Sequence, residues 1–149
     1  MKKQLYMVIT IIALLTVAGL TNANAQGPSS VEVKANIPFA FSVGNKTMPA
    51  GEYTVRCTNP NSYVKVLLIR SSDKPESALV ITQSVIGKLQ DDARLVFYRY
   101  GDHYYFAQVW LPSDSIGMQA PKSRREKQME HELAANSLAK KTIAILAQR

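Results

Sequence analysis

The sequence predicts an all-β domain, mainly an antiparallel sandwich or barrel of about seven or eight strands, with one C-terminal surface helix and a final strand. Three observations lead to this fold class. Apolar and polar residues alternate over 31–43, which is typical of a half-buried strand. Short β-rich segments then recur between turn signals up to residue 111, as in sandwiches and barrels. A charged segment with a helical capping signal follows them.

Residues 1–25 have the features of an export signal. Two lysines precede a mostly apolar segment over 5–20, and the A-x-A triplet that ends at Ala25 is typical of a cleavage site. The apolar segment is short for a membrane span and contains two threonines. We therefore expect cleavage after Ala25, a periplasmic or secreted location, and no membrane span in the mature chain. The remainder, 26–149, has the length of a single β-rich domain.

Charge and cysteine content narrow the classes of partner and of fold. The formal net charge is +7 at pH 7, and two of these charges would leave with the signal, so the mature domain is mildly basic. This favours anionic surfaces in general, but without a dense basic cluster we expect no nucleic-acid partner. Cys57 is the only cysteine, so an internal disulfide does not support the fold. We expect Cys57 to be a small buried apolar residue.

The first predicted strands lie at the start of the mature domain. Every odd position from Val31 to Val43 is apolar, so one face of an extended chain should be buried. Pro38 cannot donate a backbone hydrogen bond, and we expect a bend there that splits the segment into two strands. Glycines and a proline over 44–51 mark a connection of about eight residues. Alternation resumes over 53–57, which predicts a hairpin with this connection.

Further strands are expected before the charged C-terminal segment, each bounded by a turn signal. They cover 63–70, 77–86, 93–100 and 104–111. The segment 77–86 is apolar at both odd and even positions, which predicts a central strand covered on both faces. Gly101 and Asp102 mark a tight turn between the last two strands.

The C-terminal part differs from the rest of the chain. An irregular linker is expected over 112–122. Ser123 and Glu126 then have the spacing of a capping box, which predicts a surface helix over about 124–136. The β-branched residues in 140–148 favour a final strand over an extension of the helix.

The sequence contains no recognisable catalytic or metal-binding motif. His131 and Glu132 begin an H-E-x-x-H pattern, but Ala135 occupies the position of the second histidine. His103 is the only other histidine. Cys57 and the serines lack a nucleophile elbow of the G-x-S-x-G type. We therefore expect a protein that is not an enzyme, with no catalytic residues, no metal and no cofactor.

Aromatic residues are concentrated in the predicted hairpin over 93–111. Cross-strand aromatic pairs stabilise hairpins, and this is one interpretation. The other is that one set of these side chains lines a groove for a planar, apolar or sugar-like ligand. Tyr98 and Tyr100 share one face of the first predicted strand, and Tyr104, Phe106 and Trp110 share one face of the second. The candidate ligand-binding residues are Tyr98, Tyr100, Tyr104, Phe106, Trp110 and Arg99.

Three segments carry a resemblance to a known group of proteins. They are 36–56 (NIPFAFSVGNKTMPAGEYTVR), 95–110 (LVFYRYGDHYYFAQVW) and 121–133 (PKSRREKQMEHEL). With their N-I-P-F-x-F, P-A-G-x-Y-x-V and R-Y-G-D patterns they resemble small exported proteins of unknown function from soil bacteria. The resemblance implies export and a small β-rich domain with a late helix, and it transfers no catalytic residues.

Two functions fit these features. We expect an exported, non-catalytic β-domain that binds a protein partner or a cell-envelope component. The alternative is a lipocalin-like carrier of a small apolar ligand, which needs a cavity between its strands. An outer-membrane barrel is disfavoured because several predicted strands are short and 77–86 does not alternate.

Overall fold

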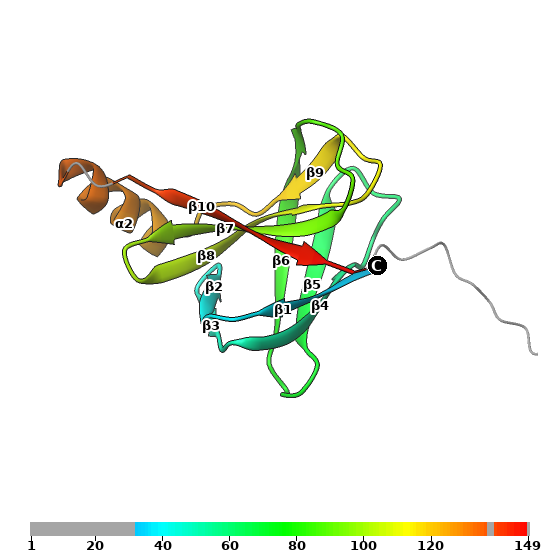
Figure 1. The fold of residues 1–149 in the computed structure, drawn as a ribbon, viewed down its shortest axis with the longest axis horizontal. Helices are drawn as coiled ribbons and strands as arrows, with labels where there is room; N and C mark the ends of the chain where they lie inside the picture. The colour runs from blue at the N-terminus through cyan, green and yellow to red at the C-terminus, as the bar shows by residue number, and fades with distance from the viewer. Residues whose placement is uncertain (1–31, 137–138, 149) are drawn as a thin grey trace, which may run out of the picture.

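The computed structural model describes residues 32–136 and 139–148. It confirms the predicted all-β fold with one C-terminal helix and a final strand (Figure 1). The predicted export signal and the cleavage site after Ala25 lie outside the described residues. Among the described residues, no helix is both long enough and apolar enough to cross a membrane.

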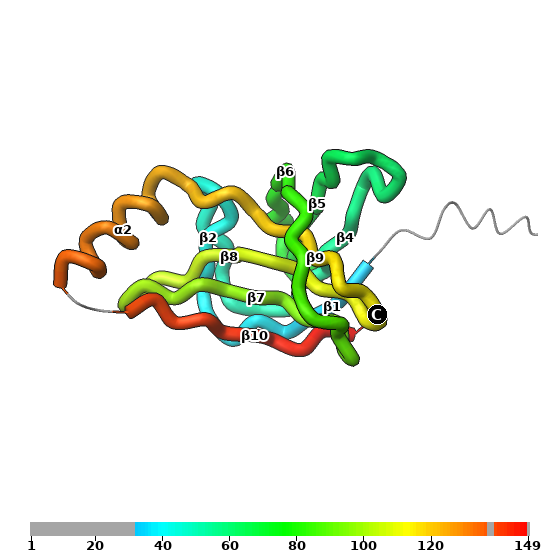
Figure 2. The backbone as a smooth tube through the Cα atoms, turned by 90° about the horizontal axis from the view of Figure 1, so that it is seen from above, coloured from blue at the N-terminus to red at the C-terminus, as the bar shows by residue number. Residues whose placement is uncertain are grey.

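The strands form one strongly curved sheet. In chain order the elements are β1 (Glu32–Ile37), β2 (Phe41–Val43), β3 (Lys46–Met48), β4 (Gly51–Cys57), β5 (Lys65–Ser71), β6 (Ser77–Ile86), β7 (Ala93–Tyr100), β8 (His103–Trp110), β9 (Ile116–Gln119), α2 (Arg124–Ala135) and β10 (Lys141–Ala147). The hydrogen-bonded order runs β1-β4-β5-β6-β9-β8 and continues through β7 to β10. Figure 2 shows β7, β8 and β10 running side by side, with helix α2 beyond one end of these strands.

The two ends of this order meet at a single bridge. The Lys34 N–H donates to the Gln148 carbonyl at 2.7 Å, and the Gln148 N–H donates back to the Lys34 carbonyl at 2.8 Å. β1 and β10 are otherwise not laddered to each other, so the sheet stays open apart from this contact. The curvature gives the sheet an inner face, which holds the core, and an outer face.

The hairpin prediction near the start of the domain is wrong about which strands pair. The bend at Pro38 is confirmed, because β1 ends at Ile37 and β2 begins at Phe41. However, β4 pairs with β1 and not with β2. The intervening residues form a second, smaller hairpin of β2 and β3, which turns at Gly44. The φ of Gly44 is +58°, a conformation that glycine adopts without steric cost.

Apolar side chains from both halves of the sheet meet on the inner face. Phe97 is fully buried, and its ring packs edge-on against Phe41 and Phe39, each with a centroid distance of 5.3 Å. Cys57 is 1% exposed in the same cluster, which confirms its prediction as a buried residue. The other fully buried large side chains include Ile37, Met48, Tyr53, Leu67, Ile69 and Leu95.

The C-terminal elements agree with the sequence prediction except in the linker. Helix α2 begins after Ser123, whose Oγ accepts the Glu126 N–H at 3.1 Å, as expected for an N-cap. β10 pairs with β7 along its whole length, which confirms the final strand. The predicted irregular linker over 112–122 is wrong in part, because it contains β9. This strand has only four residues and pairs with both β6 and β8, so it depends on its partner strands.

Candidate functional site

A β-bulge separates the aromatic residues of the β7–β8 hairpin. Phe97 lies opposite Phe106, and Val96 lies opposite Gln108, so β8 contains one extra residue between these pairs. Such a residue shifts the alternation of the strand by one position. As a result Phe106 belongs to the main core, whereas Trp110 belongs to a small cluster with Val96 on the outer face. Alternation along the strand predicts that Phe106 and Trp110 share one face, but the structure places them on opposite faces.

Tyr104 and Arg99 lie near the tip of this hairpin. The Tyr104 ring is half-buried and stacks on Phe39, with a centroid distance of 4.0 Å. The Arg99 guanidinium lies 5.4 Å from the centre of the Tyr104 ring and 3.4 Å from the exposed carboxylate of Asp102. Both side chains are thus engaged in contacts within the hairpin or with the segment that follows β1.

Tyr98 and Tyr100 lie in different surroundings from Tyr104 and Arg99. Lys140 places its Nζ 4.0 Å from the centre of the half-buried Tyr98 ring. Tyr100 is fully buried, and its hydroxyl donates to Glu126 of helix α2 at 3.4 Å. The six candidate residues therefore do not gather around one groove. They contribute to the core, to the outer cluster and to the contact with α2.

The Tyr100–Glu126 contact buries a carboxyl group. Glu126 is 4% exposed. Burial raises the pKa of its carboxyl above the ordinary value, and nearby Lys122, the Tyr100 hydroxyl and the Ser123 backbone oppose this rise. Burial also raises the pKa of Tyr100, with Glu126 adding to the effect. Because the folded state holds the Glu126 proton more tightly than the unfolded state, this group favours folding at low pH.

We expect Glu126→Gln to change how stability depends on pH. The wild-type chain should lose stability relative to the variant as pH rises from the ordinary glutamate pKa through the raised pKa of Glu126, because ionising this buried group opposes folding. Glu130→Gln is the matched control. Lys122 holds the pKa of Glu130 below its ordinary value. This variant should therefore lose stability relative to the wild type as pH rises from the lowered pKa of Glu130 to the ordinary glutamate pKa. Urea unfolding from pH 3 to pH 8 measures both differences, and a flat Glu126→Gln difference would contradict the expectation.

The prediction that 77–86 is covered on both faces is wrong. Ala78 and Val80 of β6 face the core and are 9% and 8% exposed. Leu79 and Ile81 alternate with them on the outer face and are 67% and 63% exposed. Apolar residues at both odd and even positions show that both faces of a strand are apolar. They do not show that anything covers the second face.

The neighbouring strand extends this apolar surface. In the β5–β6 ladder Leu68 lies opposite Leu79, and Val66 lies opposite Ile81. Val66 and Leu68 are half-buried. We call these four residues, Val66, Leu68, Leu79 and Ile81, the aliphatic patch. Apolar side chains that cluster on an outer face in this way indicate an interaction surface.

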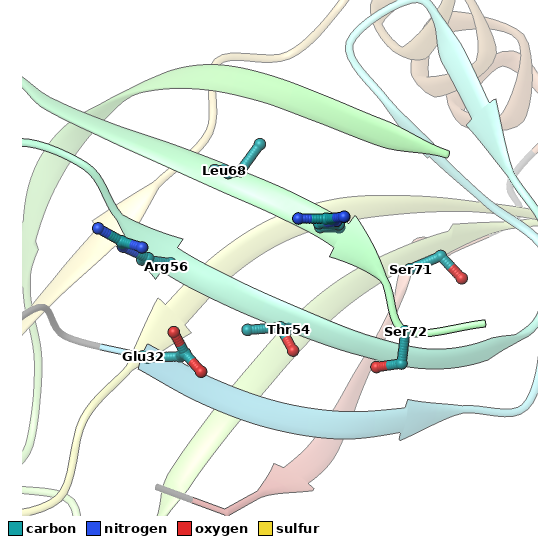
Figure 3. A pocket seen from close by; sticks show the side chains of 7 residues that line it. Glu32, Thr54, Arg56, Leu68, Ser71 and Ser72 are labelled. Carbon is teal, nitrogen blue, oxygen red and sulfur yellow. The ribbon is translucent and has the colours of Figure 1, made fainter. Parts of the chain in front are cut away.

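Two arginines border the aliphatic patch. Arg56 lies opposite Leu68 in the β4–β5 ladder, and Arg70 is two positions after Leu68 on the same strand. Together with Glu32, Thr54, Leu68, Ser71 and Ser72 they line a surface hollow of about 340 Å³, which we call the arginine hollow. Figure 3 shows side chains from β1, β4 and β5 around it. These residues were not among the candidates predicted from the sequence, because strand pairing decides which residues of β1, β4 and β5 lie side by side.

Neither arginine is paired within the described part of the chain. Arg56 and Arg70 are both exposed, and among the described residues no carboxylate oxygen lies within 4.0 Å of either guanidinium. Their positions are diagonal in the ladder, which corresponds to about 7–8 Å between such neighbours. Both guanidiniums are therefore free to bind one anionic group.

The two histidines and the cysteine lie on different elements. His103 is exposed at the start of β8, His131 is exposed on helix α2, and Cys57 is in the core. Comparison with protein-family models, with curated proteins and with solved structures finds no match for this chain. The surface itself therefore provides the basis for a functional proposal.

Proposed function

We propose that this chain is an exported, non-catalytic β-domain that binds a component of the cell envelope through the aliphatic patch and the arginine hollow. One observation carries the proposal. Leu79 and Ile81 expose about two thirds of their surface on a sheet face, next to two half-buried aliphatic residues and two arginines that have no carboxylate partner among the described residues. The predicted export signal and the basic charge are consistent with such a partner.

The inner face of the sheet favours binding at the surface over binding inside. A lipocalin-like carrier needs a cavity between its strands. In this chain Phe41, Tyr53 and Phe97 occupy that region, and their rings are in edge-on contact at centroid distances of 5.0 and 5.3 Å. The arginine hollow, by contrast, opens on the outer face of β4 and β5.

A pull-down with envelope fractions tests this proposal. The chain is purified from an exporting host, immobilised and incubated with solubilised envelope material. We expect reproducible retention of a component, reduced at least about fivefold in the Leu79→Ser/Ile81→Ser double variant, because apolar contact area is lost. Ile116→Ser/Leu146→Ser is the matched control, since these residues are 49% and 72% exposed outside the aliphatic patch. Failure to retain a component, or equal loss in both double variants, would contradict the proposal.

A further inference from the structure

We infer that the envelope component is an anionic lipid surface, with the aliphatic patch in contact with the hydrocarbon boundary and the arginine hollow holding phosphate groups. This inference rests on the proposed function and names its ligand class. It depends on three features of this part of the outer face: the extent of its apolar surface, the arrangement of its charges, and the composition of the aliphatic patch.

The apolar surface continues beyond the aliphatic patch. The connection from β4 to β5 carries Tyr63 and Val64, which are 103% and 53% exposed and directly precede β5. Val66, at the start of β5, belongs to the aliphatic patch, so the exposed apolar residues follow one another toward this end of the sheet. Aliphatic side chains that enter the boundary between headgroups and acyl chains, with tyrosine at headgroup level, are typical of proteins that lie on a membrane.

The charges of the arginine hollow suit phosphate. A guanidinium offers two parallel N–H donors to a phosphate group, and two guanidiniums on diagonal positions are able to share one headgroup or to hold two. Among the described residues that line the hollow, Glu32 is the one carboxylate, and it lies opposite Arg56 in the β1–β4 ladder. Its charge offsets one arginine and leaves the hollow with a net positive charge.

The remaining chemistry favours lipid over a glycan. Sugar rings are commonly held on aromatic faces, whereas the four residues of the aliphatic patch are valine, leucine and isoleucine, and the exposed Tyr63 lies outside the strands, in the connection before β5. An anionic lipid layer presents phosphate groups next to hydrocarbon, which is the order in which this face presents arginines and aliphatic side chains. Positive residues near such a layer add to the apolar contribution.

Vesicle sedimentation tests the inference. The exported chain and its variants, all with the same N-terminus, are mixed with vesicles of phosphatidylcholine alone or with about one third phosphatidylglycerol. We expect the wild type to prefer the anionic vesicles. Arg56→Gln and Arg70→Gln should each weaken this binding about fivefold, and Leu79→Ser/Ile81→Ser should weaken it more than about tenfold. Circular dichroism confirms that each variant is folded.

Two further variants separate a site from a general charge effect. Glu32→Gln removes the carboxylate from the arginine hollow and should strengthen binding to anionic vesicles. Arg124→Gln removes an exposed charge from helix α2 and should change binding less than about twofold, because a charge away from the lipid layer is screened. Equal effects of Arg124→Gln and Arg56→Gln would overturn the inference.

The two proposals fail in different ways. If vesicles are not bound but an envelope component is still retained through the aliphatic patch, the lipid inference is wrong and the proposed function stands. If neither vesicles nor envelope material is bound, both are wrong. Binding to both vesicle types with equal affinity would also overturn the lipid inference, because the arginine hollow would then have no part in recognition.

Discussion

Replacing Phe97 with alanine is expected to lower the free energy of unfolding by about 3–5 kcal/mol, since it removes a fully buried aromatic ring and leaves a cavity. Phe97 is 0% exposed and packs edge-on against Phe39, Phe41 and Phe106, with centroid distances of 5.3, 5.3 and 5.8 Å. These partners come from β2, from β8 and from the bend after β1. Loss of the Phe97 ring therefore affects contacts between both halves of the sheet.

Urea unfolding followed by fluorescence measures this effect, because Trp110 is the only tryptophan of the chain. A domain of this size has a total stability of about 5–15 kcal/mol, so Phe97→Ala is expected to be only marginally folded. Phe97→Leu is the second variant and should cost about 1.5 kcal/mol or less, since it keeps most of the buried volume. Tyr98→Ala, one residue away on the outer face and half-buried, should cost less than Phe97→Ala. Equal losses at the two positions would contradict this account of the core.

Gly117→Ala is expected to destabilise the chain by about 1–3 kcal/mol, because the outer cluster has no room for a side chain at this position. A Cβ added to Gly117 would lie 2.8 Å from Cδ2 and Cε2 of Trp110. The indole is 6% exposed. It is held in place by its Nε1–H, which donates to Gln108 at 2.9 Å, and Gln108 in turn donates to Gln119 at 3.0 Å. The ring therefore cannot move aside at low cost.

A double-mutant cycle with Trp110→Leu tests the cause of this effect. In the Trp110→Leu background the clash is removed, and Gly117→Ala should become neutral or slightly stabilising, since glycine in a strand interior is unfavourable by about 0.5–1 kcal/mol relative to alanine. The coupling energy should reach about 1–3 kcal/mol. Circular dichroism follows unfolding in all four proteins, because the variant lacks the fluorescent residue. Additive effects of the two substitutions would show that the indole and Gly117 are not in close contact.

The same strands provide the core and the proposed binding surface. In β5 the buried residues Leu67 and Ile69 alternate with Leu68 and Arg70 on the outer face. Changes to the outer residues should therefore alter binding with little effect on stability, since surface substitutions usually change it by less than about 0.5 kcal/mol. Changes to the inner residues should lower stability with little direct effect on binding. This separation makes the binding variants suitable tests of function.

Much of the fold follows from local patterns in the sequence. Alternation over 31–43 correctly assigns Val33, Ala35 and Ile37 to the buried face, because the side-chain period of a strand does not depend on its partners. The N-cap at Ser123 and the final strand over 141–147 are likewise encoded in neighbouring residues. These features establish an all-β fold with one late helix.

The tertiary structure decided which strands pair and which faces stay exposed. β4 pairs with β1 across an inserted hairpin, and the bulge in β8 places Phe106 and Trp110 on opposite faces. Leu79 and Ile81 are exposed although their strand is apolar on both faces. Register, bulges and the covering of a sheet face all arise from contacts between different strands, and the periodicity of a single strand contains no information about them. For this reason the aromatic residues were predictable as a group, whereas the aliphatic patch and the arginine hollow emerged only from the assembled sheet.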